Sequence, residues 1–151
     1  MLKITIFTLS LMLLPHCGGI VDNSDKVENS VSQPNPDASS DLPVLYLLTI
    51  VLDDISYQTL IGATGWEVDE ANTSSSLVQF KSGDSFAKFS HVDTLCETDT
   101  TSTNDYSFEV YECSSTLVHI SVNDKNVAIE HNLSAESIRD VTRNFQPKPD
   151  E

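Results

Sequence analysis

The residue types suited to acid–base chemistry gather in the stretch "TLVHISVNDKNVAIEH", at residues 116–131. Apolar and polar residues alternate on both sides of residues 124–125, which predicts a β-hairpin with its turn there. In that register His119 lies opposite Glu130 on the outer face, with Ser121 as a diagonal neighbour. The sequence around this set has no nucleophile elbow and no glycine-rich oxyanion turn. We therefore expect a surface ion pair between His119 and Glu130, and we expect the protein not to be an enzyme.

The opposite face of this hairpin is apolar and should lie against a core. The predicted cross-strand pairs on that face are Val122 with Val127, Ile120 with Ile129, and Val118 with His131. His91, His119 and His131 come from different predicted strands and lack the HxxxH or HExxH spacing of zinc sites. We therefore expect no metal site and no cofactor.

The three cysteines of the chain are Cys17, Cys96 and Cys113. If Cys17 is modified or removed in an exported protein, an even pair is left in an oxidising compartment, which favours a Cys96–Cys113 disulfide. That bridge would close a loop of about 18 residues and stabilise the fold by roughly 3 kcal/mol. The sequence has no CxxC motif and no histidine adjacent to either cysteine, which argues against a metal site or a catalytic thiol.

Acidic residues outnumber basic ones 23 to 8, which gives a formal charge of −15. This charge repels nucleic-acid backbones and anionic headgroups, so we expect no nucleic-acid partner and a soluble monomeric domain. The acidic residues that could ligate calcium are Asp53, Asp54, Glu97, Asp99 and Asp105. They do not follow the pattern of a calcium-binding loop, so we expect them to cap helices and lie in solvated loops.

The N-terminal segment has one positive charge at Lys3 and an apolar run at residues 4–14. A helix of that length spans roughly 16 Å, about half of a bilayer core, so the run is typical of a signal peptide. Around Cys17 the sequence resembles a bacterial lipoprotein lipobox, with Leu14 three residues before the cysteine and Gly18 directly after it. The resemblance implies that Cys17 carries a diacylglyceryl thioether and begins the mature chain. Ordinary signal-peptidase cleavage after Gly19 is the alternative, and both predict export.

Residue patterns downstream predict mostly β-structure. The apolar stretch at residues 44–52 predicts a buried strand, and Asp53–Asp54 and Gly62 as end signals predict a short helix at 55–61. The other predicted elements are a strand in "WEVDE", a hairpin in "SLVQFKSGDSFAKFSH" turning at residues 82–84, a strand at 106–113 with Tyr106, Phe108 and Val110 on one face, and a C-terminal helix capped by Ser134. The fold class is mainly β: a small antiparallel sheet or partial barrel with a short helix before Trp66 and a C-terminal helix, with α+β as the alternative.

One fold-level similarity accompanies these elements. Its motif residues are Leu60, Gly62 and Trp66, followed by Phe80, Gly83 and Phe86 in a hairpin. The set resembles the L-x-G-x-W and F-x-x-x-G-x-F motifs of bacterial lipocalin-like domains, with altered spacings. The resemblance implies a cup-shaped barrel that binds an apolar ligand, with Trp66, Phe80, Phe86 and Phe108 as candidate ligand-binding residues. The alternative is that these aromatic residues fill a core.

We therefore expect four segments: a signal peptide at residues 1–16, a lipid-anchored disordered linker at 17–41, a single β-rich domain at 42–146 and a frayed tail at 147–151. The linker prediction rests on its Ser, Asn, Asp, Pro and Gly content. The expected function is that of an exported, membrane-anchored binding or structural module of the bacterial cell envelope. A lipocalin-like carrier of a small apolar ligand is the alternative, and an envelope protein is the other partner considered.

Overall fold

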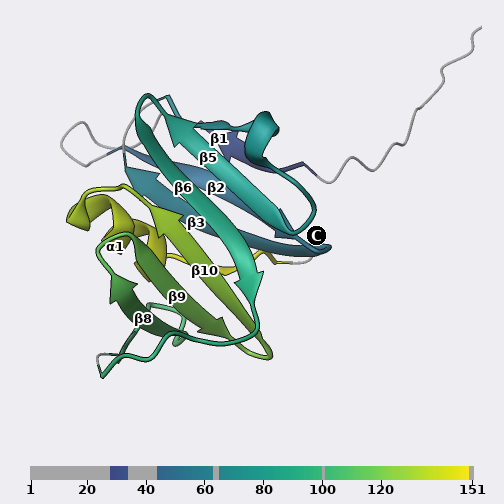
Figure 1. The fold of residues 1–151 in the computed structure, drawn as a ribbon. Coiled ribbons are helices and arrows are strands. Elements are labelled where there is room, and N and C mark those ends of the chain that lie inside the picture. Colours follow the sequence, from purple (N-terminus) through teal and green to yellow (C-terminus); the bar gives the residue numbers. More distant parts are fainter. Residues whose placement is uncertain (1–27, 34–43, 63–64, 100, 150–151) are drawn as a thin grey trace, which may run out of the picture.

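The fold, a computed structural model, is described for residues 28–33, 44–62, 65–99 and 101–149. These residues form mainly antiparallel β-structure with one short C-terminal helix, as the sequence predicts (Figure 1). The elements are β1 (Ser30–Ser32), β2 (Leu45–Leu52), β3 (Ile55–Gly62), β4 (Glu67–Val68), a 3-10 turn (Glu70–Asn72), β5 (Leu77–Ser82), β6 (Ser85–Val92), β7 (Thr101–Thr103), β8 (Glu109–Ser114), β9 (Leu117–Val122), β10 (Lys125–His131), α1 (Ala135–Arg143) and β11 (Gln146–Pro147).

The strands form two open antiparallel sheets and no closed barrel. Sheet A has four strands in the order β1-β2-β3-β11, and sheet B has seven in the order β4-β5-β6-β10-β9-β8-β7. Strand β2 of sheet A packs over β5 and β6 of sheet B, and α1 packs against β3 (Figure 1). Sheet A therefore covers one part of sheet B, while α1 lies beside sheet A and faces the part formed by β8 and β9.

The predicted helix at residues 55–61 is wrong, because these residues form strand β3. Asp53 and Asp54 have φ angles of 48° and 67°, which make them the two central residues of a tight hairpin turn and not a helix cap. Burial in β3 alternates with a period of two, since Tyr57 and Ile61 are buried and their neighbours are half-buried. The strand predicted just before this turn is confirmed as β2.

The predicted hairpin of β5 and β6 is confirmed, with Ser82 paired to Ser85 and Gly83 at a φ of 58°. The β9–β10 hairpin is also present, but its register differs from the prediction by two residues. Val122 pairs with Lys125, and the turn falls at residues 123–124. A shift of two residues keeps every side chain on its predicted face, so the apolar face is still the core face.

Three further boundaries differ from the predictions. Residues 30–32, placed in the disordered linker, form β1 and pair with β2, and Asn29 Oδ1 accepts a hydrogen bond from the Val51 amide at 2.6 Å. Strand β8 begins at Glu109, because Ser107 has a φ of 64° and therefore interrupts the extended backbone before the strand. At the C-terminus, β11 pairs with β3 and the Lys148 amide donates to the Ser56 carbonyl at 3.0 Å, so the ordered domain extends past residue 146.

Four aromatic side chains fill the interior between the sheets. Phe89 lies 5.9 Å from Phe80 and 6.4 Å from Phe145 between ring centroids, and Phe145 stacks on Tyr57 at 5.2 Å. All four side chains are buried, so each contributes a large apolar surface as well as the aromatic contact itself. This group joins β3, β5, β6 and the segment after α1 into one core.

Helix α1 is held by its cap and by sheet A. The Ser134 side chain accepts a hydrogen bond from the Ser137 amide at 3.2 Å, which confirms the predicted N-cap. Val141 is fully buried, and its carbonyl accepts a hydrogen bond from the Thr59 hydroxyl of β3 at 2.5 Å. No helix among the described ranges is both long and apolar enough to cross a membrane.

Candidate functional site

The four aromatic residues proposed as ligand-binding residues do not gather around a cavity. Trp66 and Phe80 are buried in the core, whereas Phe86 and Phe108 are half-buried. None of the four lines either of two clefts, of about 780 Å³ and about 370 Å³, that the described residues form. Trp66 and Phe80 therefore fill a core, which is the alternative that the sequence left open.

His119 lies under the segment that carries Cys96 and not on an open face. It is only 7 % exposed, faces Ala128 across the ladder, and its Nδ1 accepts a hydrogen bond from the Cys96 amide at 2.9 Å. Burial lowers the pKa of His119. Glu130 instead forms an ion pair with Lys88, with 2.6 Å between Nζ and Oε2. The predicted His119–Glu130 pair is therefore wrong, because the register shift and the covering segment separate the two side chains.

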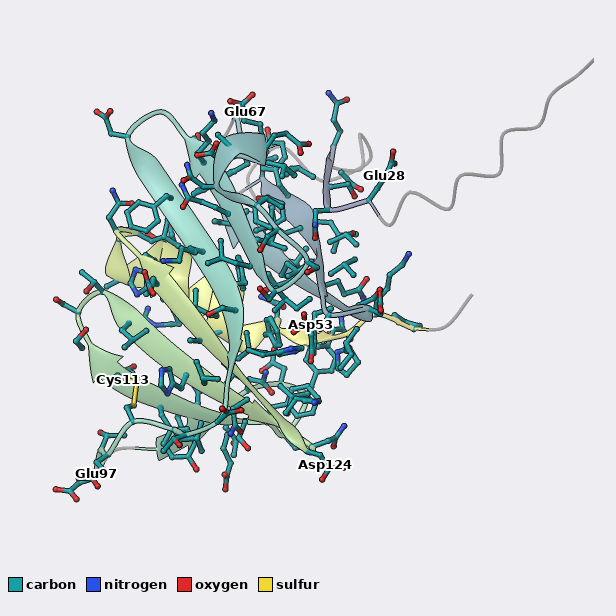
Figure 2. All side chains as sticks on the ribbon, turned by 45° about the vertical axis from the view of Figure 1, so that its right-hand side comes forward. Glu28, Asp53, Glu67, Glu97, Cys113 and Asp124 are labelled. Carbon is teal, nitrogen blue, oxygen red and sulfur yellow. A yellow bond between two sulfur atoms is a disulfide. The ribbon has the colours of Figure 1, made fainter. Side chains whose placement is uncertain are left out.

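The predicted Cys96–Cys113 disulfide is confirmed and joins β8 to the segment before β7, with 5.8 Å between the Cα atoms. Figure 2 shows this bond at the lower edge of sheet B. Among the described residues, one set of three potential metal ligands lies together, with the two cysteine sulfurs and a His119 ring nitrogen within 4.8 Å of one another. The sulfurs are bonded to each other, so neither can act as a thiolate ligand in this form.

His91 belongs to a separate hydrogen-bonded chain. Tyr57 lies with its hydroxyl 3.0 Å from His91 Nε2, and His91 Nδ1 lies 3.1 Å from Asp53 Oδ2. Burial raises the pKa of Tyr57, so the phenol stays protonated. Tyr57 is 2 % exposed and Asp53 lies in the β2–β3 turn. This chain therefore ties the β2–β3 turn of sheet A to β6 of sheet B.

The acidic residues in the described ranges are exposed, apart from the buried Asp69 and the half-buried Asp140. In Figure 2 the labelled side chains of Glu67, Glu97 and Asp124 point outward from different edges of the molecule. Asp105, one of the calcium candidates, pairs with Arg143 at 3.5 Å. The charge is therefore distributed as a solvated surface over the described part of the chain.

The larger cleft, of about 780 Å³, lies between α1 and the β7–β9 part of sheet B. We call it the α1 cleft. Its apolar lining comes from Val110 of β8, Val118 of β9, and Leu133 and Ile138 next to and on α1. Its remaining lining is polar and includes His131 at the end of β10. The cleft exists because α1 packs against β3 and leaves a gap above β8 and β9.

His131 is the buried polar group in this lining, with an exposed fraction of 2 %. Its Nδ1 accepts a hydrogen bond from the Leu133 amide at 3.2 Å, so the neutral ring carries its proton on Nε2. Nε2 has no hydrogen-bond partner among the described residues. Burial lowers the pKa of His131, which keeps the ring neutral near pH 7. His131 thus borders the α1 cleft, and its Nε2 is buried without a hydrogen-bond partner among the described residues.

Charged groups line the rest of the α1 cleft. Arg139 and Arg143 are four residues apart on α1, so both lie on one face of the helix. Arg143 is paired with Asp105, while the guanidinium of Arg139 has no ion-pair partner among the described residues. Glu112 of β8 is the other acidic group in the lining.

The loop between β7 and β8 closes one end of the α1 cleft. Asn104 Nδ2 donates to the carbonyls of Thr142 at 3.1 Å and Phe145 at 2.9 Å. Asn104 Oδ1 accepts from the amides of Tyr106 at 2.9 Å and Phe108 at 3.0 Å. A single side chain therefore fixes the loop to the C-terminal end of α1 and sets the width of the cleft.

Comparison of the chain with known protein families, with curated proteins and with solved structures gives no match.

Sequence reasoning placed His131 on the core face and did not identify the α1 cleft. The spacing of Arg139 and Arg143 on a predicted helix was a usable signal, because it put two cations of an acidic protein on one face. Asn104 gave no comparable signal, since its four hydrogen bonds depend on where α1 ends relative to β8. Cys17 lies outside the described residues.

Proposed function

We propose that the protein is an exported binding module of the bacterial cell envelope, held at a membrane by a lipid on Cys17, and that it is not an enzyme. The observation that carries this proposal is the Cys96–Cys113 disulfide. Disulfides persist in oxidising compartments, which agrees with export. The bridge also uses the other two cysteines of the chain, so Cys17 is the one thiol left for a lipid.

The non-catalytic part of the proposal is supported by how the acid–base residues are used. His119 has its Nδ1 occupied by a backbone amide, and Glu130 is paired with Lys88. The His91 ring is hydrogen-bonded to the buried Tyr57 phenol and to Asp53. These side chains hold segments together, which suits a binding or structural module.

Intact-mass measurement of the protein isolated from membranes tests the anchor. The proposal predicts a chain that begins at Cys17 and carries a diacylglyceryl group. A chain that begins at Ile20 contradicts it, because cleavage would then have followed Gly19. Cys17→Ser should abolish lipidation and release the protein from the membrane fraction. His16→Ala is the matched control, since it alters the neighbouring position, places a small residue before the cysteine and should leave lipidation intact.

A further inference from the structure

We propose that the domain lies on the bilayer through the outer face of sheet A, which is the face turned away from sheet B. The lipid on Cys17 holds the domain at the membrane, and this uncharged face with its leucine side chains contacts the lipid surface. The inference rests on the lipid anchor proposed above and adds to it the surface of the domain that meets the membrane.

Strand register divides the side chains of β2 and β3 between two faces. Leu48, Ile50 and Tyr57 are buried in the core between the sheets, so the residues that alternate with them point to the other side. On these two strands the outer face therefore carries four apolar side chains and three uncharged polar ones: Leu45, Leu47, Val51, Leu60, Thr49, Ser56 and Gln58. At the edges of the sheet, β1 and β11 add Ser30, Ser32 and Gln146.

The outer face of sheet A is more apolar than a solvated sheet face. An antiparallel sheet that packs on one side normally alternates apolar and polar residues, but β2 reads "LYLLTIVL" and is apolar on both sides. Leu45, Leu47 and Leu60 are half-buried, and they belong neither to the core nor to the partly buried residues packed against it. The elements that pack on β2 are β1 and β3 beside it and β5 and β6 on its inner face. Leu47 and Leu60 pair directly, so they form the centre of an apolar patch on the outer side.

Charge distinguishes the outer faces of the two sheets. The outer face of sheet B carries five charged residues, which are Glu67, Lys81, Lys88, Glu109 and Glu130. No described strand position on the outer face of sheet A is charged. Charged residues lie at its margins, in the β2–β3 turn, at Asp140 beside Gly62 and at Lys148 after β11. Because the chain has a formal charge of −15, an anionic bilayer repels its other surfaces more strongly than this one.

The attachment point of the proposed anchor is also on sheet A. Strand β1 is an edge strand of this sheet (Figure 1), and Asn29 directly before it accepts the hydrogen bond of the Val51 amide. Cys17 and Glu28 are 11 residues apart, a separation that can span at most about 40 Å. A lipid on Cys17 therefore keeps sheet A near the bilayer at a high effective concentration. Three partly exposed leucines are too few to hold a protein on a membrane alone, but they suffice to orient a domain that is already tethered there.

A lipid surface suits this face better than a second copy of the chain. Strands β2 and β3 have 8 residues each, so they form a strip of about 27 Å by 10 Å. A stable dimer buries about 800 Å² on each partner, which is roughly three times the area of that strip. Two copies that each carry a formal charge of −15 also repel each other.

Tryptophan emission in vesicles tests the contact. Leu60→Trp puts an indole at the centre of the outer face of sheet A, whereas Leu117→Trp puts one at a half-buried leucine on the outer face of sheet B, opposite Glu130. Both lipidated chains are reconstituted into vesicles of equal parts phosphatidylcholine and phosphatidylglycerol, with and without bromine on the acyl chains. We expect bromine to quench most of the emission that Leu60→Trp adds and none of the emission that Leu117→Trp adds. The parent chain, in which Trp66 is buried, gives the background.

Equal quenching in the two variants, or no quenching in Leu60→Trp, would overturn the proposal. If Leu60→Trp does not fold, Leu47→Trp at the paired position on β2 takes its place with the same expected result. A blue shift of the Leu60→Trp emission that grows with protein concentration in detergent would assign the face to a second copy and would also overturn the proposal. Intact mass separates the two possible failures. A chain without the lipid refutes the anchor, whereas a lipidated chain that floats with the vesicles and shows no quenching refutes only the contact through sheet A.

Discussion

The two parts of sheet B are covered in different ways. Over β5 and β6, sheet A closes an interior filled by the buried rings of Phe80, Phe89 and Phe145, with Phe89 edge-to-face to Phe80 and stacked on Phe145. Over β8 and β9, the helix α1 covers the sheet incompletely and leaves a cleft of about 780 Å³ that His131 borders. The first part is filled by side chains, and the second keeps an open volume. We call them the packed part and the open part.

This difference follows from the lengths of the elements that cover sheet B. Strands β2 and β3 have 8 residues each and lie face to face with long strands of sheet B, whereas α1 has 9 residues and rises only about 1.5 Å per residue. The helix is also drawn toward β3 by the Thr59–Val141 hydrogen bond and the buried Val141 side chain. A short helix held on one side cannot seal the whole surface of β8 and β9.

The largest expected effect lies in the packed part. Phe89→Ala should reduce the free energy of unfolding by about 3–5 kcal/mol, because Phe89 is fully buried between two other rings. Ile138→Ala in the open part should cost clearly less, since Ile138 is half-buried and borders a cleft. Urea unfolding of both variants gives the comparison. Equal losses would mean that α1 packs as tightly as sheet A.

The disulfide should have the next largest effect. Replacing Cys96 and Cys113 together with alanine should lower the free energy of unfolding by roughly 3 kcal/mol, through the added entropy of the unfolded chain. The same double variant should also expose His119, because the covering segment loses its covalent tie to β8. Denaturant unfolding under non-reducing conditions measures the first effect. A loss below about 0.5 kcal/mol would show that the bridge adds no constraint beyond the fold.

Asn104 sets the width of the open part. Asn104→Ala should cost about 2 kcal/mol, because it leaves two carbonyls at the end of α1 and two loop amides without their partner. It should also free the β7–β8 loop to move away from the helix. Asn132→Ala is a suitable control: Asn132 makes comparable hydrogen bonds to Phe86 and Asp84 at an exposed position. A smaller loss in Asn104→Ala than in Asn132→Ala would contradict this role.

Acid should destabilise the protein through its buried histidines. Burial lowers the pKa of His119 and His131 from the ordinary 6.5, so the unfolded chain takes up protons below about pH 6.5 while the folded chain does not. Stability is then constant above about pH 7.5 and falls on acidification, by up to about 1.4 kcal/mol per pH unit for each histidine.

Urea unfolding at about pH 7.5 and about pH 5.5 measures this dependence. His131→Gln should reduce the slope, because one titrating group is lost. A free energy of unfolding that stays level or rises between these pH values would contradict the burial of neutral histidines.

The sequence predicted the secondary-structure elements better than the residues with which they pair. Alternation in β9 and β10 predicted the correct faces, yet the register was wrong by two residues because either of two adjacent turns satisfies the same pattern. Asp53 and Asp54 were interpreted as a helix cap, since aspartate favours both caps and turns. Only the pairing of β2 with β3 decides between these uses, and that pairing is a tertiary feature.

The candidate site was less predictable, for a physical reason. The burial of His131 followed from its place on the core face, but the cleft beside it depends on the gap between α1 and β8. That gap depends in turn on how α1 packs on β3, which no local pattern encodes. The disulfide was predictable because it needs only an even number of cysteines in an oxidising compartment.

The most direct test of the open part is a long-range ¹H–¹⁵N spectrum of the histidine rings in the full chain. The account predicts that His131 carries its proton on Nε2, because the Leu133 amide donates to Nδ1. A proton on Nδ1 of His131 would contradict it.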